Sequence, residues 1–233
     1  MNIITHFSGK LPADARERYD ALAGLGYAPL FTAYQQHGDN IIRLRKPYTY
    51  PGLDALIEDQ PKGDAIVTDQ PGLFVGVKTA DCVPILLWDE AAGVLAAVHA
   101  GWRGTAVNIA GKTVRVMQRE FGAHDIQAAI GPCICQNCFV TRSDVPEAIT
   151  GQTGYITQIG DDQFQVDLRG INTALLQNAG VTINYQLSTI NCTCCDPEAY
   201  WSHRKHGSER GLQVSLIGNV TLHPMSASRG RNS

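Results

Sequence analysis

Cys82 and His99 are the two residues of this chain whose types and spacing point most directly to chemistry. Two apolar runs, 83–88 and 93–98, lie between them and are joined by the loop 89–92. This pattern predicts a β-hairpin with a four-residue loop. Such a hairpin places Cys82 opposite His99 on one face of a sheet, with Cβ atoms about 5 Å apart. A thiol beside an imidazole is either part of a metal site or a nucleophile with its base. The spacing also fits a buried cysteine and a hydrogen-bonded core histidine.

The residues that follow His99 are small and cationic, and a helix is predicted directly after them, over 108–114. The free N–H groups and the positive dipole end of a helix N-terminus bind anions, and Arg103 adds a guanidinium that can grip phosphate or carboxylate. Taken alone, the two glycines also suit a tight strand-to-helix turn. Beside a Cys/His pair we expect an anion site, formed by Gly101, Arg103, Gly104 and Thr105.

Several segments resemble the signature of the YfiH family, which is named both a multicopper polyphenol oxidase (laccase) domain and a purine nucleoside phosphorylase. The most specific of them are 79–86 and 99–105. Further agreement lies in 36–38, 63–69, 129–134, 166–168 and 192–193, so that the resemblance extends from about residue 30 to about residue 217. The chain departs from the family pattern at Gln36 and within residues 202–211.

The resemblance implies a metal site formed by His37, Cys82 and His99, which family descriptions assign to zinc and in some cases to copper. Three protein ligands with an open fourth position are typical of a catalytic zinc ion. The resemblance also implies phosphorolysis of purine nucleosides (adenosine, inosine, guanosine and methylthioadenosine) to free base and ribose 1-phosphate, together with some adenosine deaminase activity. Purine nucleosides and phosphate are therefore the expected substrates.

Further candidates for this chemistry lie close to the predicted ligands. Asp81, beside Cys82, is placed to act as an acid/base group or to support a ligating histidine. Arg43 and Arg45 follow His37 and are additional candidates for phosphate binding, although surface arginines are often merely solvated. The predicted catalytic group is Cys82, His99, Asp81 and Arg103.

The name laccase does not agree with the ligand count. A multicopper centre needs more imidazoles, largely in His-x-His pairs, than the seven histidines of this chain, none of which forms such a pair. A copper-dependent polyphenol oxidase with a single site remains an alternative. Two others are a hydrolase of a peptidoglycan precursor, with Cys82 as nucleophile and His99 as base, and a non-catalytic metal-binding protein.

The other cysteines include two Cys-x-x-Cys pairs, 135/138 and 192/195. Together they have the ligand types of a structural zinc site. However, 53 residues lie between Cys138 and Cys192, whereas compact zinc modules place their pairs roughly 15–20 residues apart. We therefore expect thiols packed near the wall of the active site rather than a second metal site.

Composition restricts the class of protein. The chain has 233 residues, of which 44% are hydrophobic and 18% charged, as expected for a globular domain. A net charge of −3 gives no electrostatic reason to expect nucleic-acid binding. No apolar run approaches the roughly 18–20 residues of a membrane span, and the first residues lack the basic region of a signal peptide. The expectation is a soluble, cytoplasmic protein.

Helices and strands are predicted to alternate along the chain, with at least one hairpin, which favours mixed sheets and an α+β fold. The resemblance implies an α/β/β/α layered sandwich, shared with the cytotoxic necrotising factor toxins. We expect a single domain over 1–225 and a flexible tail over 226–233. The predicted helices are 12–24, 144–150 and 168–179, and the predicted strands outside the hairpin are 30–34, 65–68, 73–77, 126–130, 181–190 and 212–220.

Overall fold

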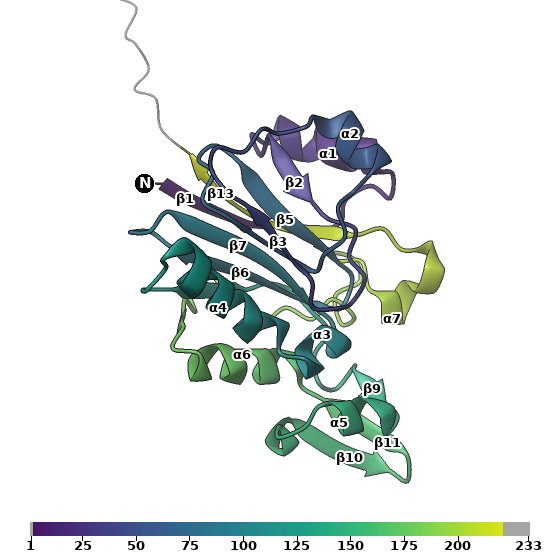
Figure 1. Cartoon of the computed structure of the whole chain (residues 1–233). Coiled ribbons are helices and arrows are strands. Elements are labelled where there is room, and N and C mark those ends of the chain that lie inside the picture. The colour runs from purple at the N-terminus through teal and green to yellow at the C-terminus, as the bar shows by residue number, and fades with distance from the viewer. Residues whose placement is uncertain (1, 221–233) are drawn as a thin grey trace, which may run out of the picture.

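The computed structural model describes residues 2–220, and its two largest sheets pack face to face (Figure 1). Each sheet contains both parallel and antiparallel neighbours, so the prediction of mixed sheets is confirmed. The four-stranded sheet has the order β1 (Asn2–Phe7), β13 (Gln213–Val220), β5 (Phe74–Thr79), β2 (Leu30–Thr32). The six-stranded sheet has the order β12 (Thr182–Ile183), β8 (Gln127–Ile130), β6 (Val83–Asp89), β7 (Val94–Ala100), β4 (Ala65–Thr68), β3 (Ile41–Leu44). The predicted tail over 226–233 lies outside the described residues.

Helices cover the outer faces of both sheets. The four-stranded sheet is covered by α1 (Ala15–Gly24) and α2 (Leu53–Glu58), and the six-stranded sheet by α4 (Ile109–Phe121) and α6 (Leu168–Asn178) (Figure 1). This confirms the predicted α/β/β/α sandwich. Across residues 2–220, no helix combines the length and the apolar character that crossing a lipid bilayer would require.

The hairpin strands β6 and β7 lie at the centre of the six-stranded sheet and are buried along their whole lengths. On one face of β6, Ile85 and Leu87 pack in the cluster beneath α4 and α6. On the other face, Leu86 and Trp88 pack against the four-stranded sheet. Burial on both faces explains why these strands are continuous apolar runs rather than alternating ones.

The register of this hairpin differs from the predicted one. Trp88 pairs with Leu95 instead of Gly93, and His99 lies opposite Pro84. The reason is that Gly93 belongs to the turn, where it has a φ of 70° and donates its N–H to the carbonyl of Asp89. The resulting shift is two residues. Because side chains alternate between faces with a period of two, an even shift keeps Cys82 and His99 on the same side of the sheet.

A smaller lobe projects from the sandwich (Figure 1). It contains β9 (Val140–Thr141), α5 (Asp144–Ala148), a 3-10 turn at Thr153–Tyr155, β10 (Ile156–Gly160) and β11 (Gln163–Val166). The short helices α3 (Trp102–Ala106) and α7 (His203–His206) and a 3-10 turn at Gly207–Glu209 complete the described elements. The predicted strand over 181–190 is wrong beyond Ile183, because the Asn184 side chain accepts the N–H groups of Gln186 and Leu187 and so forms a turn.

Candidate metal centre

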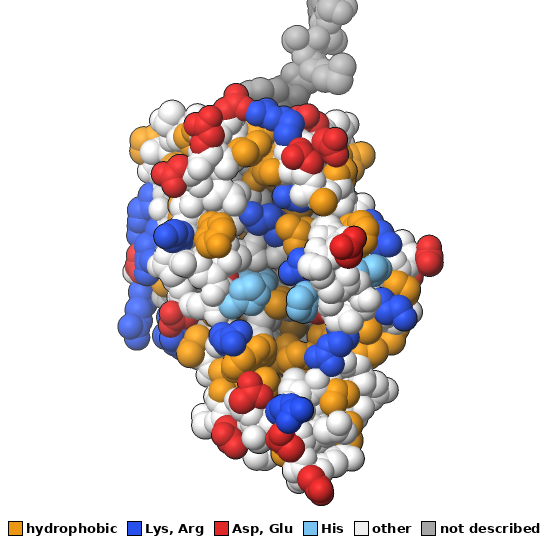
Figure 2. Space-filling view, turned by 90° about the vertical axis from the view of Figure 1, so that its right-hand side faces the viewer, with side chains coloured by type: hydrophobic (Ala, Val, Ile, Leu, Met, Phe, Trp, Pro, Cys, Tyr) orange, Lys and Arg blue, Asp and Glu red, His pale blue; other side chains and the backbone are white. Residues whose placement is uncertain are grey.

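His37, Cys82 and His99 meet at the open end of the hairpin, with their ligand atoms all within 4.8 Å of one another. His37 lies in the loop after β2, Cys82 immediately precedes β6, and His99 is near the end of β7. The two imidazole rings are 4.8 Å apart between centroids and nearly perpendicular. His99 is buried, Cys82 is half-buried and His37 is exposed, so the trio is open to solvent on the His37 side. On the face of the molecule drawn in Figure 2, histidine side chains lie beside a hollow that has Lys and Arg side chains around it.

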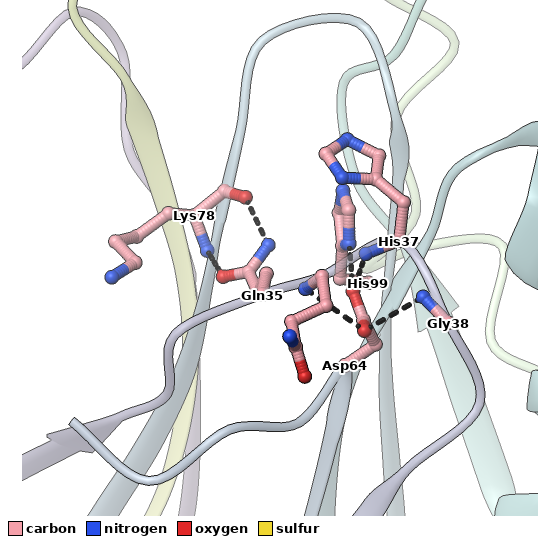
Figure 3. A network of polar contacts seen from close by, with 7 residues as sticks. Gln35, His37, Gly38, Asp64, Lys78 and His99 are labelled. Atoms are coloured by element: carbon pink, nitrogen blue, oxygen red, sulfur yellow. Dashed lines mark hydrogen bonds and ion pairs between the residues drawn. The ribbon is translucent and has the colours of Figure 1, made fainter.

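Asp64, immediately before β4, positions two members of this trio (Figure 3). Its buried carboxylate accepts a hydrogen bond from Nδ1 of His99 at 2.8 Å. The same carboxylate accepts the backbone N–H groups of His37 at 2.9 Å and of Gly38 at 2.8 Å. With Nδ1 engaged, Nε2 of His99 remains free to bind a metal ion. Support of a ligating histidine is one of the two roles predicted for Asp81, but Asp64, within the segment 63–69, provides it.

The electrostatics of the trio favour a charged sulfur. Burial by itself raises the pKa of Cys82, but attraction to His99 and hydrogen bonds with both histidines outweigh it and lower that pKa to about 6. Burial likewise lowers the pKa of His99, but Cys82 and Asp64 together raise it to about 9. The site therefore holds a thiolate near neutral pH, which is the form of cysteine that binds metal.

Asp81 contacts neither histidine of the trio through its side chain. One carboxylate oxygen accepts a hydrogen bond from Oγ1 of Thr193 at 2.6 Å, and the other accepts the backbone N–H of Arg204 at 2.7 Å. Its φ of 96° is unusual for a residue with a side chain. These contacts tie the backbone just before Cys82 to the segment that contains α7.

Glycines allow the chain to pass close to the ligands. A Cβ at Gly101 would lie 3.0 Å from Sγ of Cys82 and 3.2 Å from Cδ2 of His37. A Cβ at Gly104 would lie 3.3 Å from the carbonyl oxygen of Gly38. The N-terminal part of α3 thus passes close to Cys82 and to the loop that contains His37 and Gly38, and this close approach accounts for both glycines. Thr105 is buried, and its hydroxyl accepts a hydrogen bond from the Asn172 carboxamide at 2.8 Å.

Of the arginines predicted to bind phosphate, Arg103 lies nearest to the trio in the chain. It is exposed, with its guanidinium 4.2 Å from the centre of the Trp102 ring. Arg43 forms an ion pair with Glu120 at 2.8 Å, and Arg45 donates to the carbonyl of the same residue. Glu120 lies about 16 Å along α4 from the end that follows α3. The structure therefore does not bring Arg43 and Arg45 to the trio.

A cavity of about 190 Å³ lies against the trio and contains a cation that sequence reasoning did not select. This is Arg210, whose Nε is buried and has no hydrogen-bond partner among the described residues. The signal for it was weak, because Arg210 lies in the segment that departs from the family pattern. The remaining lining residues are Tyr34, Gln35, Lys78, Thr79, Ala80 and Leu212.

Gln35 fixes the loop that carries His37. Its carboxamide donates to the carbonyl of Lys78 at 2.7 Å and accepts the N–H of Lys78 at 2.8 Å, as a paired strand would (Figure 3). Gln36, where the chain departs from the family pattern, is exposed and contributes a backbone N–H to Asp64. That departure therefore leaves the trio intact.

The trio fits a metal ion by its donor set. Two imidazoles and one thiolate are three ligands of the types that zinc prefers, and a carboxylate behind a ligating histidine is the usual support. Donors around a tetrahedral zinc ion are about 3.5 Å apart, and the observed limit of 4.8 Å is compatible with that spacing after a small adjustment. In space, Cys82 lies beside His99, and His99 is hydrogen-bonded to Asp64. The same order of thiol, imidazole and orienting group is found in cysteine nucleophile sites.

Known proteins resemble this chain over nearly its whole length. The family model described as multi-copper polyphenol oxidoreductase laccase matches residues 10–219. A protein named adenosine deaminase RL5, from an unknown prokaryotic organism, is 40% identical over 210 residues, which cover 88% of this chain and 80% of the relative. A protein named purine nucleoside phosphorylase from Deinococcus radiodurans is 31% identical over 210 residues, covering 88% and 76%.

Solved structures show the same fold. The crystal structure of the hypothetical protein YfiH from Bacillus licheniformis superposes with a TM-score of 0.82 at 25% identity, covering 93% of this chain and 92% of the other. YlmD from Geobacillus stearothermophilus superposes with a TM-score of 0.83 at 24% identity, covering 94% and 92%. By its fold, its motifs and the extent of these matches, the chain belongs to the multi-copper polyphenol oxidoreductase laccase family, also called the YfiH family.

Proposed function

We propose that this protein is a zinc-dependent purine nucleoside phosphorylase, which converts a purine nucleoside and phosphate to free base and ribose 1-phosphate. The observation that carries this proposal is the presence, in one cavity, of a metal-binding trio and the unpaired guanidinium Nε of Arg210. Phosphorolysis requires an anion to be held beside a nucleoside, and a guanidinium group whose buried Nε has no partner among the described residues is suited to an oxyanion. The names of the relatives support the same reaction.

His37, Cys82 and His99 would hold the metal ion. When bound, zinc would supply a Lewis acid that polarises or orients an oxyanion. Asp64 keeps the proton of His99 on Nδ1 and holds the His37 loop in place. These residues thereby present their donor atoms in one direction, toward the cavity.

The cavity itself restricts how substrate binds. Its volume is below the roughly 300–1,000 Å³ of typical small-molecule sites, so part of a nucleoside must extend beyond its rim. Tyr34 lies at this rim and is 57% exposed. Its ring offers an apolar face on which a purine can stack. Arg210, at the same cavity, would hold the phosphate.

In the proposed reaction a phosphate oxygen forms a bond to C1′ of the ribose while the bond from C1′ to the base breaks. The base leaves with the electron pair of that bond and takes up the proton that the hydrogen phosphate gives up. Arg210 neutralises charge on the attacking phosphate, and Arg103 remains a second candidate for this role because it follows the trio so closely.

The test is to incubate the purified protein with adenosine or inosine over a range of phosphate concentrations and to quantify free base and ribose 1-phosphate. We expect base release that rises with phosphate and saturates, with equal amounts of both products. Base release that is independent of phosphate would show hydrolysis instead and would overturn the proposal.

Adenosine deamination is a second candidate, because a relative that is 40% identical is named adenosine deaminase. The same incubation separates the two activities. Deamination forms inosine and ammonia without free base, and its rate does not require phosphate.

A cysteine hydrolase is favoured by one observation, the order Cys82–His99–Asp64. In that case Cys82 must be free to react. Alkylation of Cys82 by iodoacetamide in the protein as purified would support the hydrolase, whereas protection of Cys82 until a chelator is added would support the metal site.

A further inference from the structure

A second group of metal-ligand side chains lies outside the cavity. Cys135, Cys138, Cys192 and Cys195 have their Sγ atoms within 4.8 Å of one another. Sγ of Cys195 is 3.4 Å from that of Cys138 and 3.9 Å from that of Cys135. Four thiolates around one tetrahedral zinc ion at about 2.3 Å have sulfurs about 3.8 Å apart. The long separation in sequence therefore does not keep the two pairs apart, contrary to our expectation.

We propose that these four cysteines bind one structural zinc ion, in a site separate from the trio. A site with four protein ligands is closed and has no position for substrate, as is usual for structural zinc. Soft thiolate donors select zinc, copper(I) and iron–sulfur clusters over harder ions, and a tetrahedral set of four sulfurs is typical of zinc or iron. Sulfurs this close together surround a single ion and leave no room for the inorganic sulfides of an iron–sulfur cluster.

The backbone around the cysteines is already arranged for this role. Each pair has the Cys-x-x-Cys spacing, and Cys192 of the second pair forms a parallel bridge with Cys133, two residues before the first pair, so that the two pairs lie side by side. The N–H of Cys135 donates to Sγ of Cys192 at 3.2 Å. A hydrogen bond of this kind stabilises a charged sulfur.

The other cysteines of this region do not belong to the cluster. Sγ of Cys133 accepts a hydrogen bond from the guanidinium of Arg169 at 3.2 Å. Cys194 lies next to Cys195 in the chain but is not a member of the group. It therefore offers a matched control for any substitution in the cluster.

The position of the cluster indicates what the ion would stabilise. It joins the loop after β8 to the segment before α7. The N–H of Ile134 donates to the carbonyl of Asp81 at 2.9 Å, and the hydroxyl of Thr193 donates to the Asp81 carboxylate. Both contacts lie beside the cluster and hold the residue that precedes Cys82. The zinc ion would thus support the backbone at the mouth of the cavity without contacting substrate.

The experiment counts zinc by mass spectrometry in variants that separate the two sites. We expect about two zinc ions per chain in the wild type, about one in Cys82→Ala and close to none in the double variant Cys82→Ala/Cys138→Ser. The control Cys194→Ser should retain about two. Because each substitution removes a different ion, failure of the trio and failure of the cysteine cluster are distinguishable.

A measurement on Cys82→Ala alone covers the case in which the double variant does not fold. Its remaining zinc should be released by an organomercurial as the cluster thiols react, and cobalt substituted for it should give the absorption of a tetrathiolate site. Zinc-free Cys82→Ala, iron in place of zinc, or a disulfide between any two of the four cysteines in the unreduced protein would each overturn the proposal.

Discussion

The carboxylate of Asp64 is bonded to Nδ1 of His99 at 2.8 Å while it also accepts the backbone N–H of His37. One buried side chain thus orients two of the three candidate ligands. The replacement Asp64→Asn keeps the shape of the side chain but removes its charge. An amide has one accepting oxygen instead of two, so it can no longer accept every one of these hydrogen bonds.

We expect Asp64→Asn to weaken zinc binding at the trio by roughly 10- to 100-fold, the usual effect of removing a partner of a ligating histidine. Competition with a chromogenic chelator measures this. The matched control is Asp162→Asn in the small lobe, where the carboxylate is exposed and pairs with Arg142. Equal affinities in the two variants would contradict the role assigned to Asp64.

Gly101→Ala tests whether close packing sets the geometry of the trio. The added Cβ would lie 3.0 Å from Sγ of Cys82, so the sulfur or α3 must move. Overpacking of this kind costs about 1–3 kcal/mol. Zinc affinity at the trio should fall although all three ligands remain. Gly24→Ala, where nothing lies within 4 Å of the new Cβ, is the control. Unchanged affinity in Gly101→Ala would show that the site is not tightly packed.

Arg210→Ala tests the proposed phosphate site. Loss of a hydrogen bond to a charged group costs about 1.5–3 kcal/mol, so the KM for phosphate should rise by roughly ten- to a hundredfold, while zinc content and the KM for nucleoside change little. Arg142→Ala, which removes an exposed arginine of the small lobe, is the control. A larger effect from Arg103→Ala than from Arg210→Ala would transfer the assignment to Arg103.

Lys78 predicts a pH dependence of stability. Burial, with repulsion from Arg18, lowers its pKa from 10.5 to about 8 in the folded protein. Between these values the unfolded chain binds more protons than the folded one, so this residue makes stability rise with pH from about 8 to 10.5. Below that window the burial of its charge is unfavourable.

The variant Lys78→Met removes this unfavourable term but also loses the hydrogen bond from Nζ to Gln60. We expect a net gain of about 1–3 kcal/mol in the free energy of unfolding at pH 7, which diminishes as the pH rises from about 8 to 10.5. Denaturant unfolding of both proteins at several pH values measures the difference. A gain that is independent of pH would show that Lys78 is not titrating as described.

The sequence predicts much of this fold because its central strands are apolar on both faces. Two such runs predict the hairpin, and the predicted register differs from the observed one by an even number of residues because Gly93 belongs to the turn and not to a strand. Even so, Cys82 and His99 stay on one face. The strand predicted beyond Ile183 is wrong because a single side chain, that of Asn184, forms a turn in a segment that alternates apolar and polar residues.

The site was less predictable where long-range contacts decide. Asp64 lies 35 residues from His99, and no local pattern connects them. Arg43 and Arg45 are close to His37 in sequence, yet β3 runs away from the ligand loop and brings them to Glu120. The cysteine pairs show the converse case, since the chain between them forms the small lobe and α6 and then returns.

The trio also has a consequence for how a preparation of this protein is judged. Its members come from a loop fixed by Asp64 and from the first and last strand ends of the buried hairpin, which meet at its open end in the centre of the six-stranded sheet. These segments come together only when the strands have paired and the loop has docked. If the trio binds zinc as proposed, a chain that retains zinc there has a complete core, and zinc content at this site would also measure the correctly folded fraction.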